Sequence, residues 1–99
     1  MAYFLGIGTS TTGSKALVID QRGQVVSVAS SPHTLQRPKL LWSEQDPQEW
    51  WRAGSASIRA VLEKAGIGGE RMGAVGLTGQ MHGLVLLDEW GNVLRPAIL

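Results

Sequence analysis

Hydrophobic residues in the first third of the chain form three short runs that are separated by polar, glycine-containing turns. The runs at 3–8 and 15–20 are almost continuously apolar, which predicts buried strands, and VVSVAS at 25–30 predicts a third. Between the second and third runs stands DQRGQ, residues 20–24, with Asp at the first turn position and Gly at the fourth. This spacing is typical of a type I turn followed by a bulge. We therefore expect the second and third strands to be antiparallel, within a meander of three strands.

The middle of the chain contains one amphipathic helix, which follows a proline-containing loop at 31–42. Asp46 is a favourable N-cap, Pro47 suits the first helical position, and Glu49 has the spacing of a capping box. Apolar residues then recur every three or four positions, as in a helix with one side facing a core. Gly66 is expected to end the helix. The predicted apolar stripe comprises Trp50, Gly54, Ile58, Val61, Leu62 and Ala65.

Further strands are predicted after the helix. The segment MGAVGLTGQ at 72–80 follows a strand and a helix, so we expect it to lie parallel to an earlier strand. GLVLLD at 83–88 predicts another strand, and DEWGN at 88–92 repeats the Asp-x-x-Gly turn spacing. The apolar segment 93–99 predicts a further strand or an extended tail. The order of elements predicts an α/β fold, and the end inside an apolar run indicates a truncated domain.

The composition restricts the function classes. A chain of 99 residues is enough for one small domain, and its apolar fraction of 43% is ordinary for a globular protein. Nine basic and eight acidic residues, without a basic cluster, do not indicate a nucleic-acid partner. Neither a membrane span nor a signal peptide is recognised. The absence of cysteine fits a reducing cytoplasm, and the two histidines lack metal-ligand spacing, so we expect a cytoplasmic protein and assign no metal ligands.

The turn TSTTGS at 9–14 combines glycine with hydroxyl side chains and leads to Lys15. Glycine lets a ligand approach the backbone closely, successive N–H groups can surround an anion, and Lys15 adds a positive charge. The turn is therefore a candidate phosphate site. It lacks the spacing of a Walker loop and leads into a strand rather than a helix. An ordinary hairpin turn, whose Ser and Thr residues serve solubility, is the alternative.

A second candidate site is TGQMHG at 78–83, at the end of a predicted central strand, where ligands of α/β sheets gather. Gln80 and His82 can hydrogen-bond sugar hydroxyls, and Met81 offers an adaptable apolar contact. The alternative for His82 is a satisfied, partly buried imidazole in a strand-end loop.

Three stretches in this order and spacing, LGIGTSTTGSKALVID, LWSEQDPQEWW and GLTGQMHGLVLLDEWGNVLRPAIL, carry a resemblance that covers nearly the whole chain. They resemble the N-terminal segment of xylulokinase-like members of the FGGY family of carbohydrate kinases. The resemblance implies the first part of an actin-like, ribonuclease-H-like ATPase domain, with residues 1–99 belonging to the first kinase domain and the remainder and the second domain absent.

The same resemblance implies an activity and a set of site residues. The reaction would transfer the γ-phosphoryl group of ATP, with Mg²⁺, to the 5-hydroxyl of D-xylulose and give D-xylulose 5-phosphate. The glycine-rich hairpin matches the phosphate loop of the family, which assigns ATP binding to Thr11, Thr12, Gly13 and Lys15. The QMHG loop matches the sugar site, which assigns the ketose contacts to Gln80, Met81 and His82. We also expect the protein to form a homo-oligomer.

The sequence departs from the family pattern at residue 8. The family reads Gly-Ile-Asp where this chain reads Gly6-Ile7-Gly8, so the acid that helps to hold magnesium and phosphate is absent. The catalytic base of the family lies beyond residue 99. We therefore assign no catalytic residue and expect the 99-residue chain alone to be inactive. Three alternatives stay open: another FGGY sugar or polyol kinase, a sugar- or nucleotide-binding pseudokinase, and a structural domain without a ligand, whose cut sheet would associate with other copies.

Overall fold

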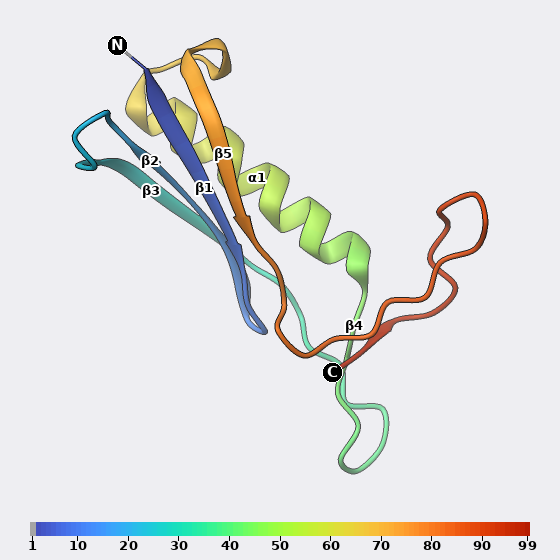
Figure 1. Cartoon of the computed structure of the whole chain (residues 1–99). Coiled ribbons are helices and arrows are strands. Elements are labelled where there is room, and N and C mark those ends of the chain that lie inside the picture. Colours follow the sequence, from blue (N-terminus) through green and yellow to red (C-terminus); the bar gives the residue numbers. More distant parts are fainter. Residues whose placement is uncertain (1) are drawn as a thin grey trace.

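The computed structural model describes residues 2–99 and shows a four-stranded sheet with one long helix on one face (Figure 1). β1 (Tyr3–Thr9), β2 (Gly13–Ile19) and β3 (Val25–Pro32) form an antiparallel meander, and β5 (Met72–Thr78) lies parallel to β1. The strand order is β3-β2-β1-β5. The predicted α/β class, the meander and the parallel strand after the helix are confirmed.

The turn that connects β2 and β3 forms as its sequence predicts. The Gly23 N–H donates to the Asp20 carbonyl oxygen at 3.0 Å, and Gly23 has a φ of +81°. The Asp20 carboxylate accepts from the backbone N–H groups of Arg22 at 2.9 Å and of Gln24 at 3.0 Å. The strand register shifts at Ile19, which is the expected bulge. The turn therefore satisfies its own N–H groups with its own carboxylate.

The helix α1 (Pro47–Ala65) begins and ends at the predicted residues. The Asp46 carboxylate accepts from the Gln48 N–H at 2.9 Å, and the Gly66 N–H donates to the Glu63 carbonyl oxygen at 3.1 Å. Gly66 has a φ of +67°, a conformation that glycine adopts without steric cost. A single 3₁₀ turn, η1 (Gly69–Arg71), joins α1 to β5.

Two details of the predicted helix are wrong. The reciprocal bond of a capping box is not found among residues 2–99, because the Glu49 carboxylate accepts from Arg52 at 2.8 Å instead; this bond holds the pKa of Glu49 below its ordinary value. The buried face is also more polar than the apolar stripe, since Ser57 is fully buried and donates to the Ser14 carbonyl oxygen at 3.0 Å. The buried helix residues are Ala53, Gly54, Ser57 and Val61.

The core lies between α1 and the strands β2 and β3, against which the helix mainly packs (Figure 1). Its buried members are Leu5, Ala16, Val18, Ala29 and Val61. The edge strand β5 is less covered, and its residues Val75 and Leu77 are 58% and 74% exposed. Both edge strands of the sheet therefore present apolar side chains at the surface, since Val25 and Val26 of β3 are also exposed.

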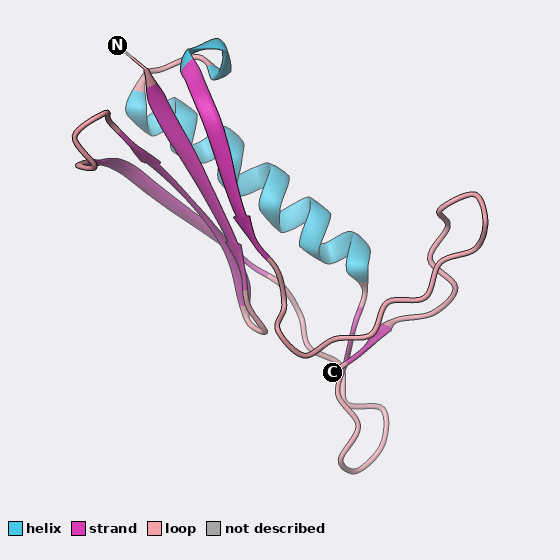
Figure 2. Cartoon of the chain, viewed as in Figure 1, coloured by secondary structure: helices cyan, strands magenta, loops and turns pink. Residues whose placement is uncertain are grey.

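The predicted strand at 83–88 is wrong. This segment makes only two isolated bridges, from Leu84 to Ile98 and from Leu87 to Val93, within an extended arm (Figure 2). Leu84 and Leu87 are 52% and 53% exposed, so their apolar side chains have little to pack against within residues 2–99. A continuous apolar run favours a strand only where a neighbouring strand and a core cover it.

A second, small sheet pairs β4 (Glu44–Gln45) with β6 (Ala97–Ile98) in antiparallel register. It holds the end of the chain against the segment that precedes α1 (Figure 1). Of the predicted strand or tail at 93–99, only β6 is a strand. No helix in the described part of the chain is long and apolar enough to cross a membrane.

Candidate functional site

The hairpin turn at residues 10–13 connects β1 to β2 at one end of the sheet. The Gly13 carbonyl oxygen accepts from the Ser10 N–H at 2.9 Å and from the Ser10 hydroxyl at 3.1 Å. A Cβ atom at residue 13 would lie 2.9 Å from the Ser31 carbonyl oxygen of β3, closer than side chains come to backbone. Glycine is therefore required at residue 13 for the two strands to pair.

The hairpin turns its carbonyl groups toward the protein. The Thr11 carbonyl oxygen accepts from the Gln45 side chain, and the Thr12 carbonyl oxygen accepts from the His33 N–H at 3.1 Å. Within residues 2–99 the N–H groups of Thr11 and Thr12 donate to no acceptor. Free backbone donors at the tip of a turn form a partial positive charge that suits an anion.

Lys15 adds a full positive charge beside this turn. Its side chain is exposed, and within the described residues it forms no ion pair. An open depression of about 380 Å³ lies next to the hairpin. It is lined by Ser10, Thr12, Gly13, Ser14, Lys15, Ser30, Ser31 and Pro32. Of the four residues predicted to bind ATP, three line this depression, and the fourth, Thr11, lies at the tip beside them.

The second predicted site meets the hairpin through one residue. The Gln80 side-chain amide donates to the Thr11 hydroxyl at 3.3 Å, although the two residues are far apart in sequence. A second depression of about 380 Å³ is lined by Thr9, Trp50, Leu77, Thr78, Gly79, Gln80, Gly83 and Val85. Met81 is 86% exposed, and His82 is also exposed, so neither lines this depression. The alternative of a partly buried, satisfied His82 is wrong.

Residue 8 lies where the two sites come together. Gly8 on β1 pairs with Lys15 on β2 and with Thr78 on β5. A Cβ atom at residue 8 would lie 3.3 Å from the Thr78 hydroxyl oxygen, a tight contact with the end of a side chain and with no other atom within 4 Å. The position therefore accepts a side chain with a modest adjustment, and it faces the strand ends that carry both candidate sites.

Five of the eight acidic residues of the chain form hydrogen bonds or ion pairs elsewhere. Asp20 and Asp88 close turns, Asp46 caps the helix, Glu49 binds Arg52, and Glu44 pairs with Arg95. No group of three His, Cys, Asp or Glu residues that could hold a metal ion occurs in residues 2–99. Hydroxyl groups, backbone N–H groups and Lys15 fit the phosphates of a nucleotide, whereas the residues present do not fit a magnesium site, because no carboxylate stands at the hairpin.

Gln45 and His33, which the sequence did not single out, support the hairpin together with Trp50, which was predicted only as part of the apolar stripe of the helix. The Gln45 carboxamide is fully buried, with its oxygen accepting from the Trp50 indole N–H at 2.8 Å and its nitrogen directed at the hairpin and at His33. They lie in segments read only as a loop and a helix start. No local pattern identifies Gln45 or His33, since a buried polar residue in a loop has no periodic signal.

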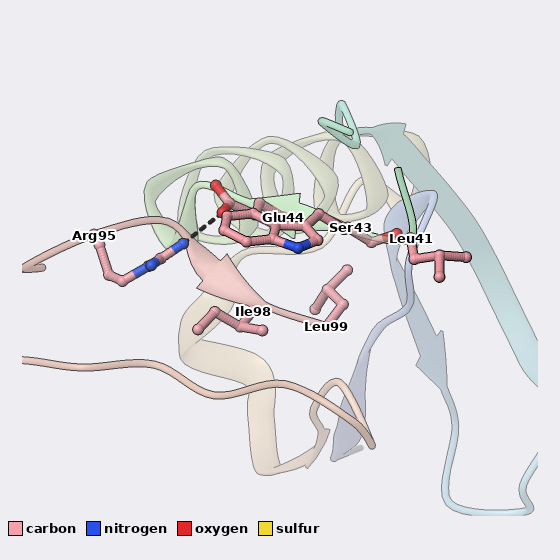
Figure 3. A pocket seen from close by; sticks show the side chains of 7 residues that line it. Leu41, Ser43, Glu44, Arg95, Ile98 and Leu99 are labelled. Atoms are coloured by element: carbon pink, nitrogen blue, oxygen red, sulfur yellow. Dashed lines mark hydrogen bonds and ion pairs between the residues drawn. The ribbon is translucent and has the colours of Figure 1, made fainter. Parts of the chain in front are cut away.

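A separate pocket of about 160 Å³ lies beside the small sheet (Figure 3). Its apolar lining comes from Leu41, Trp42, Ile98 and Leu99. The ion pair between Arg95 and Glu44 lies at its edge. The hairpin and the Gln80 loop do not contribute to it. The pocket is thus distinct from the two adjoining candidate sites.

The family model for the N-terminal domain of the FGGY family of carbohydrate kinases matches residues 3–99. The chain belongs to the FGGY family of carbohydrate kinases. The xylulose kinase of Escherichia coli K12 is 41% identical over 96 residues, which are 97% of this chain and 19% of that protein. The chain thus spans about a fifth of the length of the curated relatives it matches.

Solved structures agree with this assignment. The xylulose kinase of Rhodospirillum rubrum superposes with a TM-score of 0.88 at 36% identity, covering 97% of this chain and 20% of that one. A gluconate kinase of Lactobacillus acidophilus has the same TM-score at 28% identity, covering 98% and 19%. The α/β arrangement described above is therefore that of the N-terminal domain of the actin-like kinases of this family.

Proposed function

We propose that this chain is part of an ATP-dependent kinase that phosphorylates the 5-hydroxyl of D-xylulose and releases D-xylulose 5-phosphate and ADP. The observation that carries the proposal is the hairpin whose carbonyl groups are bound inward and whose Thr11 and Thr12 N–H groups are free beside Lys15. The xylulose kinases among the relatives support the choice of sugar.

Phosphoryl transfer depends on positioning and on neutralising charge rather than on covalent chemistry by the protein. In this proposal the Thr11 and Thr12 N–H groups donate to phosphate oxygens, Gly13 allows the close approach, and the Lys15 ammonium offsets the negative charge. The bond from Gln80 to the Thr11 hydroxyl brings the sugar side of the site next to the phosphate side. Met81 and His82, exposed beside Gln80, would contact the ketose when it binds. The attacking 5-hydroxyl needs a base that residues 1–99 do not provide.

The decisive experiment is a coupled assay of ATP turnover with D-xylulose on the full-length protein that carries this segment, with Gly8 retained and with Gly8→Asp. A Cβ atom at residue 8 would meet only the Thr78 hydroxyl oxygen within 4 Å, at 3.3 Å, so the substitution needs Thr78 to shift slightly. Turnover by both proteins supports the proposal and shows that residue 8 needs no acid here. Turnover by the aspartate variant alone means that the natural protein is a binding protein. Turnover by neither removes D-xylulose as the substrate.

Two other functions have specific support. Glycine at residue 8 favours a pseudokinase that binds sugar or nucleotide without turnover, because no carboxylate stands beside the hairpin. The similarity to a gluconate kinase favours another sugar or sugar acid as substrate. Isothermal titration with ATP and with D-xylulose, followed by turnover assays with a panel of ketoses, polyols and gluconate, separates these functions.

We also propose that the protein forms a homo-oligomer. The β5 edge of the sheet and the exposed Val75 and Leu77 present an apolar surface that a partner would cover. For the isolated 99-residue chain, sedimentation at increasing concentration should show association. A single monomeric species at high concentration would contradict this expectation.

A further inference from the structure

The side chain of Gln45 occupies a fully buried position beneath the hairpin. Its Nε2 donates to the Thr11 carbonyl oxygen and lies 3.3 Å from the Thr34 carbonyl oxygen and 3.2 Å from His33 Nδ1. Its Oε1 accepts from Trp50 Nε1 at 2.8 Å. Both ends of one carboxamide are therefore engaged, and its donor end faces the hairpin.

The surroundings of Gln45 allow only one orientation of the carboxamide. Exchanging its oxygen and nitrogen would direct the oxygen at two carbonyl oxygens and the nitrogen at the Trp50 indole N–H. Both contacts would then join like partners, donor with donor and acceptor with acceptor. His33 Nδ1 lies 3.2 Å from the same nitrogen, and the donor and acceptor roles of this third contact depend on the tautomer of the ring.

The bond from Gln45 fixes the direction of a peptide plane in the hairpin. All peptide bonds of the described chain are trans, so the carbonyl group of Thr11 and the N–H group of Thr12 point in opposite directions. With the Thr11 carbonyl bound to Gln45, the Thr12 N–H faces away from Gln45, and Thr12 lines the open depression together with Lys15.

We propose that Gln45 is a positioning residue for ATP: by holding the Thr11 carbonyl group inward, it presents the Thr12 N–H to the phosphates. The inference rests on the proposed function of the hairpin. The peptide plane of a tight turn can rotate between alternative turn types. A rotation here would direct the Thr11 carbonyl oxygen at a phosphate, and the partial negative charge of that oxygen would repel the phosphate. The Gln45 donor opposes this rotation, and the bond from the His33 N–H to the Thr12 carbonyl oxygen restrains the next peptide in the same sense.

The test compares Gln45→Glu and Gln45→Met in the full-length protein. Glutamate keeps the shape and loses the donors, whereas methionine loses them without burying a charge and so keeps the test valid if the glutamate variant fails to fold. The same two substitutions at Gln21, an exposed residue in the turn at the opposite end of β2, serve as controls. The readouts are the KM for ATP, the KM for D-xylulose, and hydrogen exchange at the Ser10 and His33 amides, whose bonds to Gly13 and Thr12 close the hairpin.

Both Gln45 variants should raise the KM for ATP by about tenfold, since one buried hydrogen bond is lost, and change the KM for D-xylulose by less than about twofold. Exchange at the two amides should become faster, and the Gln21 variants should behave as wild type. A parallel rise of both KM values, a lowered melting temperature alone, or unchanged exchange at both amides would overturn the inference, because Gln45 would then serve the core only. If the wild type phosphorylates no sugar, the proposed function fails, and amide exchange with equilibrium binding of ATP then decides the role of Gln45 by itself.

Discussion

The two turns at opposite ends of β2 have similar lengths, but they differ in which backbone groups are hydrogen-bonded within the protein. In the turn from Asp20 to Gln24, the Asp20 carboxylate accepts hydrogen bonds from two backbone N–H groups, so these donors are not available to a ligand. In the hairpin at residues 10–13, the protein binds the carbonyl groups instead, and the Thr11 and Thr12 N–H groups stay available. A glycine-containing turn can therefore bind an anion only when other groups bind its carbonyl oxygens and its backbone N–H groups stay free. In the proposed function, the absence of an acid from the hairpin leaves these donors available to a phosphate.

The largest effect is expected from placing a carboxylate in the hairpin, which would make the hairpin resemble the turn at 20–24. Thr12→Asp should weaken ATP binding by about a hundredfold, or about 3 kcal/mol, because the carboxylate competes for the free N–H groups and repels phosphate. Thr12→Asn is the control, because asparagine has the shape of aspartate without its charge, and it should lose far less ATP affinity. Isothermal titration of the full-length protein with ATP measures both. Equal losses for the two variants would show that shape rather than charge matters at residue 12.

The two turns should also differ in their tolerance of alanine at glycine. Gly13→Ala places Cβ at 2.9 Å from the Ser31 carbonyl oxygen and should lower the free energy of unfolding by about 2 kcal/mol. In Gly23→Ala the new Cβ atom meets no atom within 4 Å. The only cost is the strain of an alanine at a φ of +81°, which should lower the free energy of unfolding by about 1 kcal/mol. Urea denaturation compares the two. A larger loss for Gly23→Ala than for Gly13→Ala would contradict the close approach of β3 to the hairpin.

Removing the Asp20 carboxylate from the turn at 20–24 should have a smaller effect on the free energy of unfolding. Asp20→Ala leaves the Arg22 and Gln24 N–H groups to solvent and should cost about 1 kcal/mol of unfolding free energy. Asp20→Asn retains an oxygen acceptor and should cost less than half as much. Thermal unfolding of both variants measures the difference, and ATP binding should be unchanged in each. An effect on ATP affinity would mean that the two ends of β2 are not independent.

The smallest effect concerns the second Asp-x-x-Gly turn. The Asn92 side chain, followed by the backbone N–H groups of the turn, holds the pKa of Asp88 below its ordinary value. Asn92→Ala should therefore raise the pKa of Asp88 toward that value, which NMR titration of the carboxyl carbon measures. Glu89→Gln in the same turn removes a charge but not the bond, so it should not raise the pKa of Asp88. An unchanged pKa in Asn92→Ala would assign the shift to the backbone alone.

The sign of the pH dependence follows from the lowered pKa. Asp88 contributes to stability above the ordinary pKa of its unfolded state, and this contribution is lost as the pH falls through the lower folded pKa. Asn92→Ala should flatten the acid side of the stability profile and leave the neutral range unchanged.

Local interactions explain why much of the fold was predictable. The turns at 20–24 and 88–92, the cap at Asp46 and the end at Gly66 depend on bonds between residues a few positions apart. The periodicity of α1 and the apolar runs of β1 and β2 predicted the elements that pack on one another. The strand at 83–88 was wrong because its apolar run lacks a paired neighbour within residues 2–99.

The sequence by itself determined the hairpin, its glycine, its lysine and the absence of an acid at residue 8. Only the tertiary structure decided that the hairpin carbonyl groups face inward, because Gln45 reaches Thr11 across 34 positions of the chain. It also brought Gln80 to the Thr11 hydroxyl across 69 positions while Met81 and His82 remained at the surface. Residue type sets which groups can bond, but the packing of α1 and the two sheets sets which of them meet, and the free donors of the hairpin result from that packing.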